Sequence, residues 1–195
     1  MAFVCDIQIE GDPEVAPLKF CDALYVVADE RQLVAFAPVV VWCEVCDSFQ
    51  AGESPDSPED IRKHIRDAEE GTFQGVANFL LESPDQIRQW AAYWQRQLTC
   101  RLVRQSPPKC LCCGSTAIWG LDERSPNSFV IPSSGKLAAL SLTFDESAVD
   151  KRLRLYTPEG DLLGEIPRYD PCNNRQFDDS TPYDVVMTML RTMGL

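Results

Sequence analysis

The sequence contains a single histidine, His64, and none of the short motifs that mark common catalytic sites. One histidine excludes any mechanism that needs two, and H-E-x-x-H, G-x-S-x-G and P-loop patterns are absent. His64 lies in a polar, amphipathic helical segment, where we expect its imidazole at the surface. We therefore predict no catalytic residue and a protein that is not an enzyme. An enzyme that works through unidentified carboxylates remains an open alternative, since Asp and Glu are abundant in this chain.

Long hydrophobic stretches are also missing from the chain. The longest apolar run extends from Leu33 to Val41, well short of the roughly 18 residues that a membrane-spanning helix requires. The segment Met1 to Ile7 has neither a basic region nor a long apolar core, so we expect no secretory signal peptide. These features predict a cytoplasmic protein without a membrane partner.

Basic residues are scarce, because 18 Lys and Arg stand against 30 Asp and Glu for a formal net charge of −12. Residues 1–83 carry 17 acids and 5 bases, net −12, and residues 111–195 carry 12 acids and 8 bases, net −4. An acidic surface repels phosphate groups and disfavours broad nucleic-acid or anionic-membrane binding. We expect this surface to keep the protein in solution and to contact another protein.

Residues 84–110 differ from the rest, with one acid and five bases for a net charge of +4. The five basic residues are Arg88, Arg96, Arg101, Arg104 and Lys109. They lie on a predicted long helix and just after it. One interpretation is that they pair with the surplus of acids or face solvent. The alternative is a nucleic-acid-binding protein that uses this basic helix.

Nine cysteines are present, and four of them form two pairs with metal-ligand spacing. The first knuckle is Cys43-Glu44-Val45-Cys46, and the second is Cys110-Leu111-Cys112-Cys113, followed by Gly114. Zinc commonly takes four thiolates from two C-x₂-C pairs at about 2.3 Å. Glycine after the second cysteine permits the tight turn that points N–H groups at sulfur. The spacing predicts one structural Zn²⁺ on Cys43, Cys46, Cys110 and Cys113.

The second knuckle resembles one half-site of a zinc ribbon, which reads C-x-x-C-G. The resemblance covers about 20 residues and implies only the four thiolate ligands. Sixty-three residues separate Cys46 from Cys110, whereas ribbon knuckles are commonly about 10–20 residues apart. We interpret residues 57–105 as a helical insertion between the two halves of the zinc site. Four protein ligands would close the site, which indicates a structural role rather than catalysis.

The remaining cysteines leave some assignments open. An odd number of cysteines disfavours a disulfide framework, and we expect Cys5, Cys21, Cys100 and Cys172 to be small core residues. Cys112 is expected to be a spare thiol, although Cys112 or Cys172 could replace a predicted ligand. A thioredoxin-like role for the first knuckle would need a helix after Cys46, and the residues that follow do not resemble a helix start.

The hydrophobic patterns predict an α+β fold in a single domain over residues 1–195. An antiparallel sheet would unite strands before Cys46 with strands after Cys113, and Pro38 would interrupt one strand run. Residues 50–56 are expected to form a polar loop. Helices are expected after Ser57, around 72–81, after Ser83 and at the C-terminus from Ser180. On the helix after Ser83 we expect one apolar face, formed by Ile87, Trp90, Ala91, Trp94, Leu98 and Leu102.

Overall fold

The computed structural model describes residues 2–20, 22–70, 84–121, 128–145, 152–170, 175–178 and 180–192. The secondary-structure elements in these ranges are β1 (Ala2–Ile9), β2 (Val15–Lys19), β3 (Asp22–Val27), β4 (Gln32–Phe36), β5 (Val39–Cys43), β6 (Ser48–Gly52), α1 (Pro58–Glu70), α2 (Pro84–Val103), β7 (Ile118–Gly120), β8 (Ser128–Val130), β9 (Leu137–Asp145), β10 (Arg152–Tyr156), β11 (Leu162–Pro167), β12 (Tyr169–Asp170), β13 (Arg175–Gln176) and α3 (Tyr183–Thr192).

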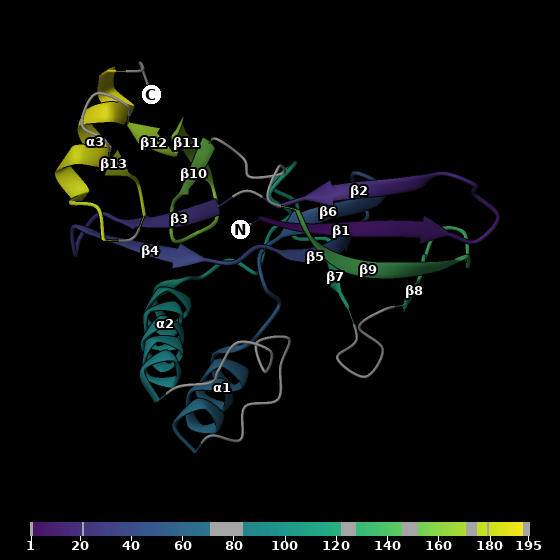
Figure 1. The fold of residues 1–195 in the computed structure, drawn as a ribbon, viewed down its shortest axis with the longest axis horizontal. Helices are drawn as coiled ribbons and strands as arrows, with labels where there is room; N and C mark the ends of the chain where they lie inside the picture. The colour runs from purple at the N-terminus through teal and green to yellow at the C-terminus, as the bar shows by residue number, and fades with distance from the viewer. Residues whose placement is uncertain are drawn as a thin grey trace.

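The predicted α+β class is confirmed, with α1 and α2 between β6 and β7 and with α3 at the C-terminal end (Figure 1). The strands form sheets in the orders β2-β1-β9-β8, β11-β10-β3-β4 and β6-β5-β7, and β12 pairs with β13. Each of the three larger sheets joins strands from before Cys46 to strands from after Cys113. Most pairings are antiparallel, but β3 and β10 run parallel. The single-domain organisation stays a prediction.

Pro38 separates two strands that belong to different sheets. The apolar run that starts at Leu33 ends as β4 at Phe36, and the chain resumes as β5 at Val39. Proline has no N–H to donate to a sheet, so the chain changes sheets at the residue where the ladder cannot continue. β5 then ends at Cys43, which places the first knuckle at a strand end.

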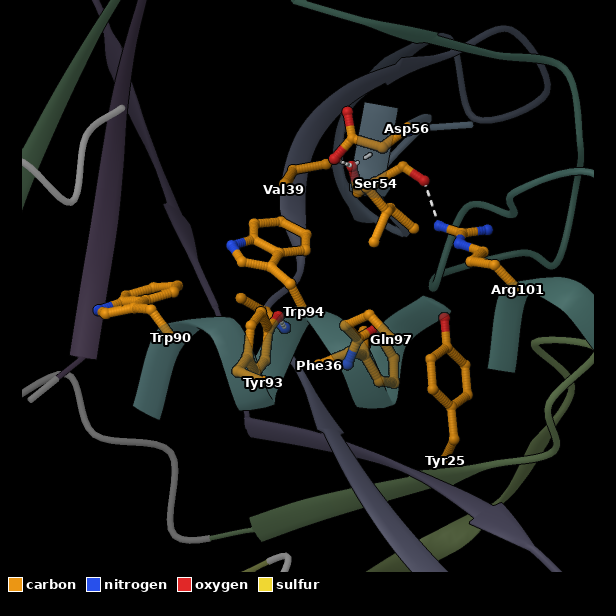
Figure 2. Close-up of a pocket in the computed structure, with 12 residues that line it drawn as sticks. Tyr25, Phe36, Val39, Ser54, Asp56, Trp90, Tyr93, Trp94, Gln97 and Arg101 are labelled. Carbon is orange, nitrogen blue, oxygen red and sulfur yellow. Dashed lines mark hydrogen bonds between the residues drawn. The ribbon is translucent and has the colours of Figure 1, made fainter. Parts of the chain in front are cut away.

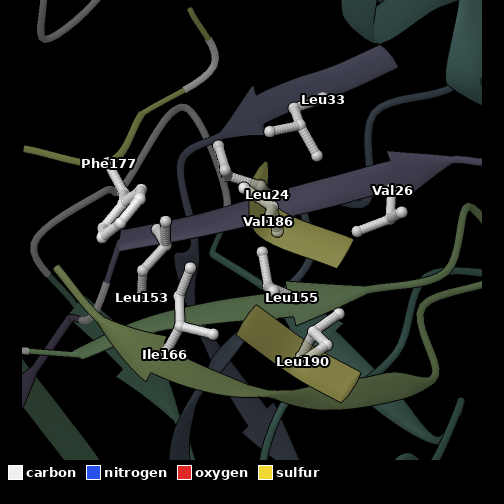
Figure 3. Close-up of a cluster of buried hydrophobic side chains, with 9 residues drawn as sticks. All are labelled: Leu24, Val26, Leu33, Leu153, Leu155, Ile166, Phe177, Val186 and Leu190. Carbon is white, nitrogen blue, oxygen red and sulfur yellow. The ribbon is translucent and has the colours of Figure 1, made fainter. Parts of the chain in front are cut away.

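Strand β3 is buried on both faces, which explains its nearly continuous apolar sequence. On one face, Leu24 and Val26 pack with Leu155 of β10 and with Val186 and Leu190 of α3 (Figure 3). On the opposite face, a second cluster joins the sheet to α2 through Cys100 and also includes Leu111 of the second knuckle. The second knuckle therefore rests on the same core that holds α2.

A third core lies between the sheet of β1 and the sheet of β5. Cys5 and Ile7 of β1 pack against Val40, Trp42 and Phe49 of the β5–β6 hairpin, and Figure 1 shows the two sheets side by side. The rings of Trp42 and Phe49 meet edge to face, with centroids 5.1 Å apart. This packing immobilises the hairpin whose turn carries the first knuckle.

Helix α1 begins with a reciprocal cap at Ser57 and Asp60. The hydroxyl of Ser57 accepts from the Asp60 N–H at 3.2 Å, and the Ser57 N–H donates to the Asp60 carboxylate at 2.9 Å. The predicted helix around 72–81 and the cap at Ser83 fall outside the described residues. Within the ranges above, no helix is both long and apolar enough to cross a membrane.

Candidate metal centre

The four predicted cysteine ligands lie together. The Sγ atoms of Cys43, Cys46, Cys110 and Cys113 are all within 4.8 Å of one another, and those of Cys43 and Cys113 are 3.5 Å apart. Sulfur atoms at about 2.3 Å from a tetrahedral ion are about 3.8 Å from each other. The cluster therefore has the size of a tetrahedral four-thiolate metal site.

The first knuckle occupies the turn between β5 and β6. Cys43 pairs in register with Ser48 across this hairpin, and residues 44–47 make the connection. Asp47 has a positive φ of 48°, in the left-handed region. Aspartate reaches this region more readily than most residues because its short polar side chain can bond locally. The turn after Cys46 thus has the conformation that glycine supplies in the second knuckle.

The second knuckle closes through hydrogen bonds of its own backbone. The Gly114 N–H donates to the carbonyl of Cys110 at 2.9 Å, and the Cys110 N–H donates to the carbonyl of Ser115 at 2.8 Å. Gly114 has a φ of +74°, as expected from its position after Cys113. This tight loop directs backbone N–H groups toward the sulfur atoms.

Backbone hydrogen bonds hold the two knuckles against each other. The Glu44 N–H donates to the carbonyl of Ala117 at 3.0 Å, and Cys43 pairs with Ile118 where β5 meets β7. On the other side, the Leu111 N–H donates to the carbonyl of Ala51 on β6 at 3.0 Å. The protein scaffold thus brings together two cysteine pairs that are 63 residues apart in sequence.

Glu53 anchors the segment that enters the second knuckle, and no motif in the sequence marks this residue. Its side chain is 0% exposed and accepts from the Arg104 guanidinium at 2.5 Å. It also accepts from the Tyr25 hydroxyl at 2.5 Å and from the Lys109 N–H at 2.7 Å. Lys109 immediately precedes Cys110, so this buried carboxylate positions the start of the knuckle.

The thiol groups differ in their electrostatic environments. Burial raises the pKa of Cys110 to about 11, although the N–H groups of Cys113 and Cys112 oppose this shift. The N–H of Ser115 is the main cause of a lowered pKa at Cys113. Burial, together with hydrogen bonds to neighbouring thiols, raises the pKa of Cys46. Since metals bind thiolates, metal binding to this cluster must release protons.

The ligands also differ in accessibility. Cys43 and Cys110 are buried, Cys46 is half-buried and Cys113 is exposed. Cys112 is exposed and lies outside the cluster, which agrees with its prediction as a spare thiol. The predicted core positions of Cys5 and Cys100 are confirmed. Cys21 and Cys172 fall outside the described residues, and the replacement of a ligand by Cys172 is therefore untested.

The chain continues from the first knuckle as a strand. β6 begins at Ser48 and pairs with β5, so no helix follows Cys46. The thioredoxin-like alternative depends on a helix at this point to lower a thiol pKa. The expected polar loop over 50–56 is wrong in its first part, because Gln50, Ala51 and Gly52 belong to β6.

Two of the five predicted nucleic-acid-binding cations are held in ion pairs. The Arg104 side chain is only 3% exposed and pairs with Glu53, and the Lys109 Nζ lies 2.5 Å from the Asp161 carboxylate. Arg101 donates to the backbone carbonyl of Ser54. Among the other two, Arg88 is exposed and Arg96 is half-buried.

His64 does not lie on the open surface, contrary to the expectation from its polar helical segment. Its ring packs on the indole of Trp94, with centroids 4.7 Å apart, and its side chain is 21% exposed. Its Nε2 lies 3.8 Å from the Asp56 carboxylate. The reason is that α1 packs against α2, so this face of α1 meets the aromatic residues of α2.

No protein-family model, no curated protein and no solved structure matches this chain significantly. The interpretation of function therefore rests on the geometry of the cysteine cluster and its surroundings.

Proposed function

We propose that this chain is a non-enzymatic binding or adaptor protein. Its fold would be held together by one structural Zn²⁺ on Cys43, Cys46, Cys110 and Cys113, a cross-link called the clasp below. The observation that carries the proposal is the approach of all four sulfur atoms to within 4.8 Å. Cysteine side chains from two distant segments rarely converge in this way unless a disulfide or a metal requires it.

The donor set favours zinc in a structural role. Four thiolates in a tetrahedral arrangement suit zinc or iron, and four protein ligands leave no open position for water or substrate. Both knuckles have a left-handed residue after the second cysteine, Asp47 and Gly114. In the second knuckle, backbone N–H groups also point at the sulfur of Cys110, which supports thiolate ligation. A closed site of this kind stabilises a fold and does not perform catalysis.

The metal would cross-link the two ends of the helical insertion. The loop from Cys46 to Cys110 contains α1 and α2, and its closure removes conformational freedom from the unfolded chain. Because the metal binds only when both knuckles are in place, its binding free energy adds to folding free energy. The clasp would therefore hold the helices in a fixed position against the sheets.

A protein partner is supported by the charge and by exposed apolar residues beside the clasp. The net charge of −12 favours a basic partner over a nucleic acid. Val45 in the first knuckle is 68% exposed, and Trp119 on β7 is 51% exposed. The Trp119 indole N–H donates to the Glu44 carboxylate at 2.7 Å, so a polar group and an apolar ring are presented together.

The nucleic-acid alternative has weaker support. Arg104 and Lys109 already pair with Glu53 and Asp161, which removes two of the five cations on which that alternative relied. Binding of single-stranded RNA or duplex DNA that weakens with salt, and that is lost on substitution of Arg96 and Arg101, would favour the alternative and contradict the proposed adaptor role.

The metal content of the purified full chain tests the clasp. We expect one zinc per chain in the parent protein and in Cys112→Ser, the matched control for an exposed cysteine outside the cluster. Cys43→Ser and Cys110→Ser should both lose the ion and unfold at a lower temperature. Retention of zinc in either variant, or absence of metal from the parent protein, would contradict the proposal.

A further inference from the structure

A cavity of about 280 Å³ lies between α2, α1 and the β4–β5 segment (Figure 2). Its walls are mainly aromatic, with rings from both the sheet and α2: Tyr25, Phe36, Trp90, Tyr93 and Trp94. Concave, mostly apolar cavities with a few polar groups are the usual form of small-molecule sites. Among the residues that the structure describes, the cavity shares none with the cysteine cluster, so the two sites can be tested separately.

Two side chains of opposite charge line this cavity without pairing with each other. They are Asp56 and Arg101. The Arg101 guanidinium donates to the backbone carbonyl of Ser54, and no carboxylate in the described part of the chain forms an ion pair with it. In Figure 2, Trp94 and Arg101 lie on opposite sides of the cavity, and Asp56 lies between them at the top of the view. The cavity therefore presents a separated positive and negative charge within an aromatic lining.

The Asp56 carboxyl is ionised near neutral pH. Burial opposes its ionisation, but hydrogen bonds with His64 and with the Ser54 hydroxyl outweigh burial and lower its pKa. The Ser54 hydroxyl donates to Oδ2 at 2.6 Å, and the His64 Nε2 lies 3.8 Å from the same oxygen. A carboxylate has about four lone-pair sites on its two oxygens. Asp56 thus keeps the capacity to accept from a positively charged guest.

The aromatic walls suit a guest that carries both a ring and an ammonium group. Tyr93 meets Trp90 and Trp94 edge to face, with centroids 5.5 and 5.2 Å apart. Aromatic pairs gain about 0.5–1.5 kcal/mol beyond the burial of their surface, and ring faces also attract cations. The walls alone therefore accept an aromatic hydrocarbon or an aromatic cation, and the two charged side chains must select between guests.

We infer that this cavity binds a free α-amino acid with an aromatic side chain. The carboxylate of the guest would pair with the Arg101 guanidinium, whose planar fork matches a carboxylate. Its ammonium group would donate to Asp56, and its ring would pack on the aromatic walls.

Guests with a single charge satisfy only part of this lining. A cation without a carboxylate gains Asp56 and the ring faces, but it is repelled by Arg101 and leaves the guanidinium without a counter-charge. An anion without an ammonium group gains Arg101 but is repelled by Asp56. A guest with both charges pairs with both side chains.

Isothermal titration calorimetry on the full chain tests this inference with three ligands that share a phenyl ring. L-phenylalanine carries both charges, 2-phenylethylammonium lacks the carboxylate, and 3-phenylpropanoate lacks the ammonium group. We expect saturable binding of L-phenylalanine, tighter than the binding of either analogue by about tenfold or more. Equal or tighter binding of either analogue, or no binding of L-phenylalanine, would overturn the inference.

Two substitutions should then change the ligand preference in opposite ways. Arg101→Gln removes the positive charge, so 2-phenylethylammonium should bind as tightly as L-phenylalanine. Asp56→Asn removes the negative charge, so 3-phenylpropanoate should bind as tightly as L-phenylalanine. Arg191→Gln, at an exposed position of α3, is the matched control and should keep the preference of the parent protein. The unfolding temperature shows that each variant is folded, and an unchanged preference in folded Arg101→Gln or Asp56→Asn would place the binding elsewhere.

Discussion

Asp47 and Gly114 share a left-handed backbone conformation, with φ values of +48° and +74°, at the position after the second cysteine of each knuckle. The two half-sites therefore turn in the same way although only one of them carries glycine. Each turn lets the chain reverse around a pair of thiolates. This shared geometry, together with the four clustered sulfur atoms, is the structural basis of the proposed metal clasp.

Gly114→Ala should destabilise the zinc-loaded protein by about 1–2 kcal/mol, because alanine pays a steric cost in the left-handed region. A methyl group at this position would contact nothing within 4 Å, so the cost comes from the backbone alone. Asp47→Gly should be neutral or stabilising. Urea unfolding, with zinc affinity measured by competition with a chelator, checks both variants.

Gly11→Ala is the matched control for this comparison. Gly11 has a φ of +80° and equally open space, but it lies in the β1–β2 turn. It should lose similar stability without a change in zinc affinity. An equal drop in zinc affinity for Gly11→Ala and Gly114→Ala would mean that the second turn has no specific role in metal binding.

Glu53→Gln should destabilise the protein by about 3–5 kcal/mol, because the buried Arg104 guanidinium would lose its counter-charge. Glutamine keeps a single acceptor oxygen, so it can accept from the Tyr25 hydroxyl or from the Lys109 N–H but not from both, since these groups bond to different oxygens of Glu53. The double variant Glu53→Gln with Arg104→Met should recover part of this loss, since no buried charge remains unpaired. Chemical unfolding of the parent, of Glu53→Gln, of Arg104→Met and of the double variant gives the coupling energy. A cost below about 1 kcal/mol for the single variant, as for a surface ion pair, would refute the account of this anchor.

Glu159 should contribute a pH-dependent part of the stability. Its carboxylate accepts from the N–H groups of Gln105 and Ser106, and these bonds hold its pKa at about 2 instead of 4.5. Because the folded-state pKa is depressed, the contribution is complete above pH 4.5 and is lost as the pH falls toward 2. Glu159→Gln should therefore destabilise the protein at pH 7, with a difference from the parent that shrinks in this window.

The exposed Glu69 on α1 provides the control for this titration. Any metal bound to the cysteine cluster would be lost alike from the parent protein and from Glu159→Gln when the thiols protonate in acid. The comparison therefore uses the difference in stability between variant and parent at each pH. Glu69→Gln should show no change of that difference between pH 7 and pH 2.5. A constant difference for Glu159→Gln over the same range would show that its hydrogen bonds do not favour the charged form.

The cysteine cluster could be predicted because the spacing of the cysteines is a local property of the sequence. The spacings Cys43-x-x-Cys46 and Cys110-x-x-Cys113 are those of two half-sites that share one ion. Gly114 indicates the turn after Cys113. Helices α1 and α2 were predictable for the same reason, since caps and periodicity involve neighbouring residues. Asp47 carries no comparable signal in the sequence, because aspartate adopts the left-handed region less routinely than glycine does.

The rest depends on contacts between distant segments. Nothing near Glu53 in the sequence indicates that it would be buried with Arg104, 51 residues later. The predicted apolar face of α2 is wrong at Leu102, which is 57% exposed, while Gln97 and Cys100 are buried. The side chain of Gln97 is buried because it donates to the carbonyl of Ala35 on β4, a tertiary contact that helical periodicity does not encode.

X-ray absorption at the zinc edge of the purified full chain tests the central claim most directly. The account predicts one zinc per chain with four sulfur neighbours at about 2.3 Å and no nitrogen or oxygen ligand. The Cys112→Ser protein should give the same spectrum, because this thiol lies outside the cluster. A spectrum with fewer than four sulfur neighbours, or with an oxygen ligand, would contradict a closed site on Cys43, Cys46, Cys110 and Cys113.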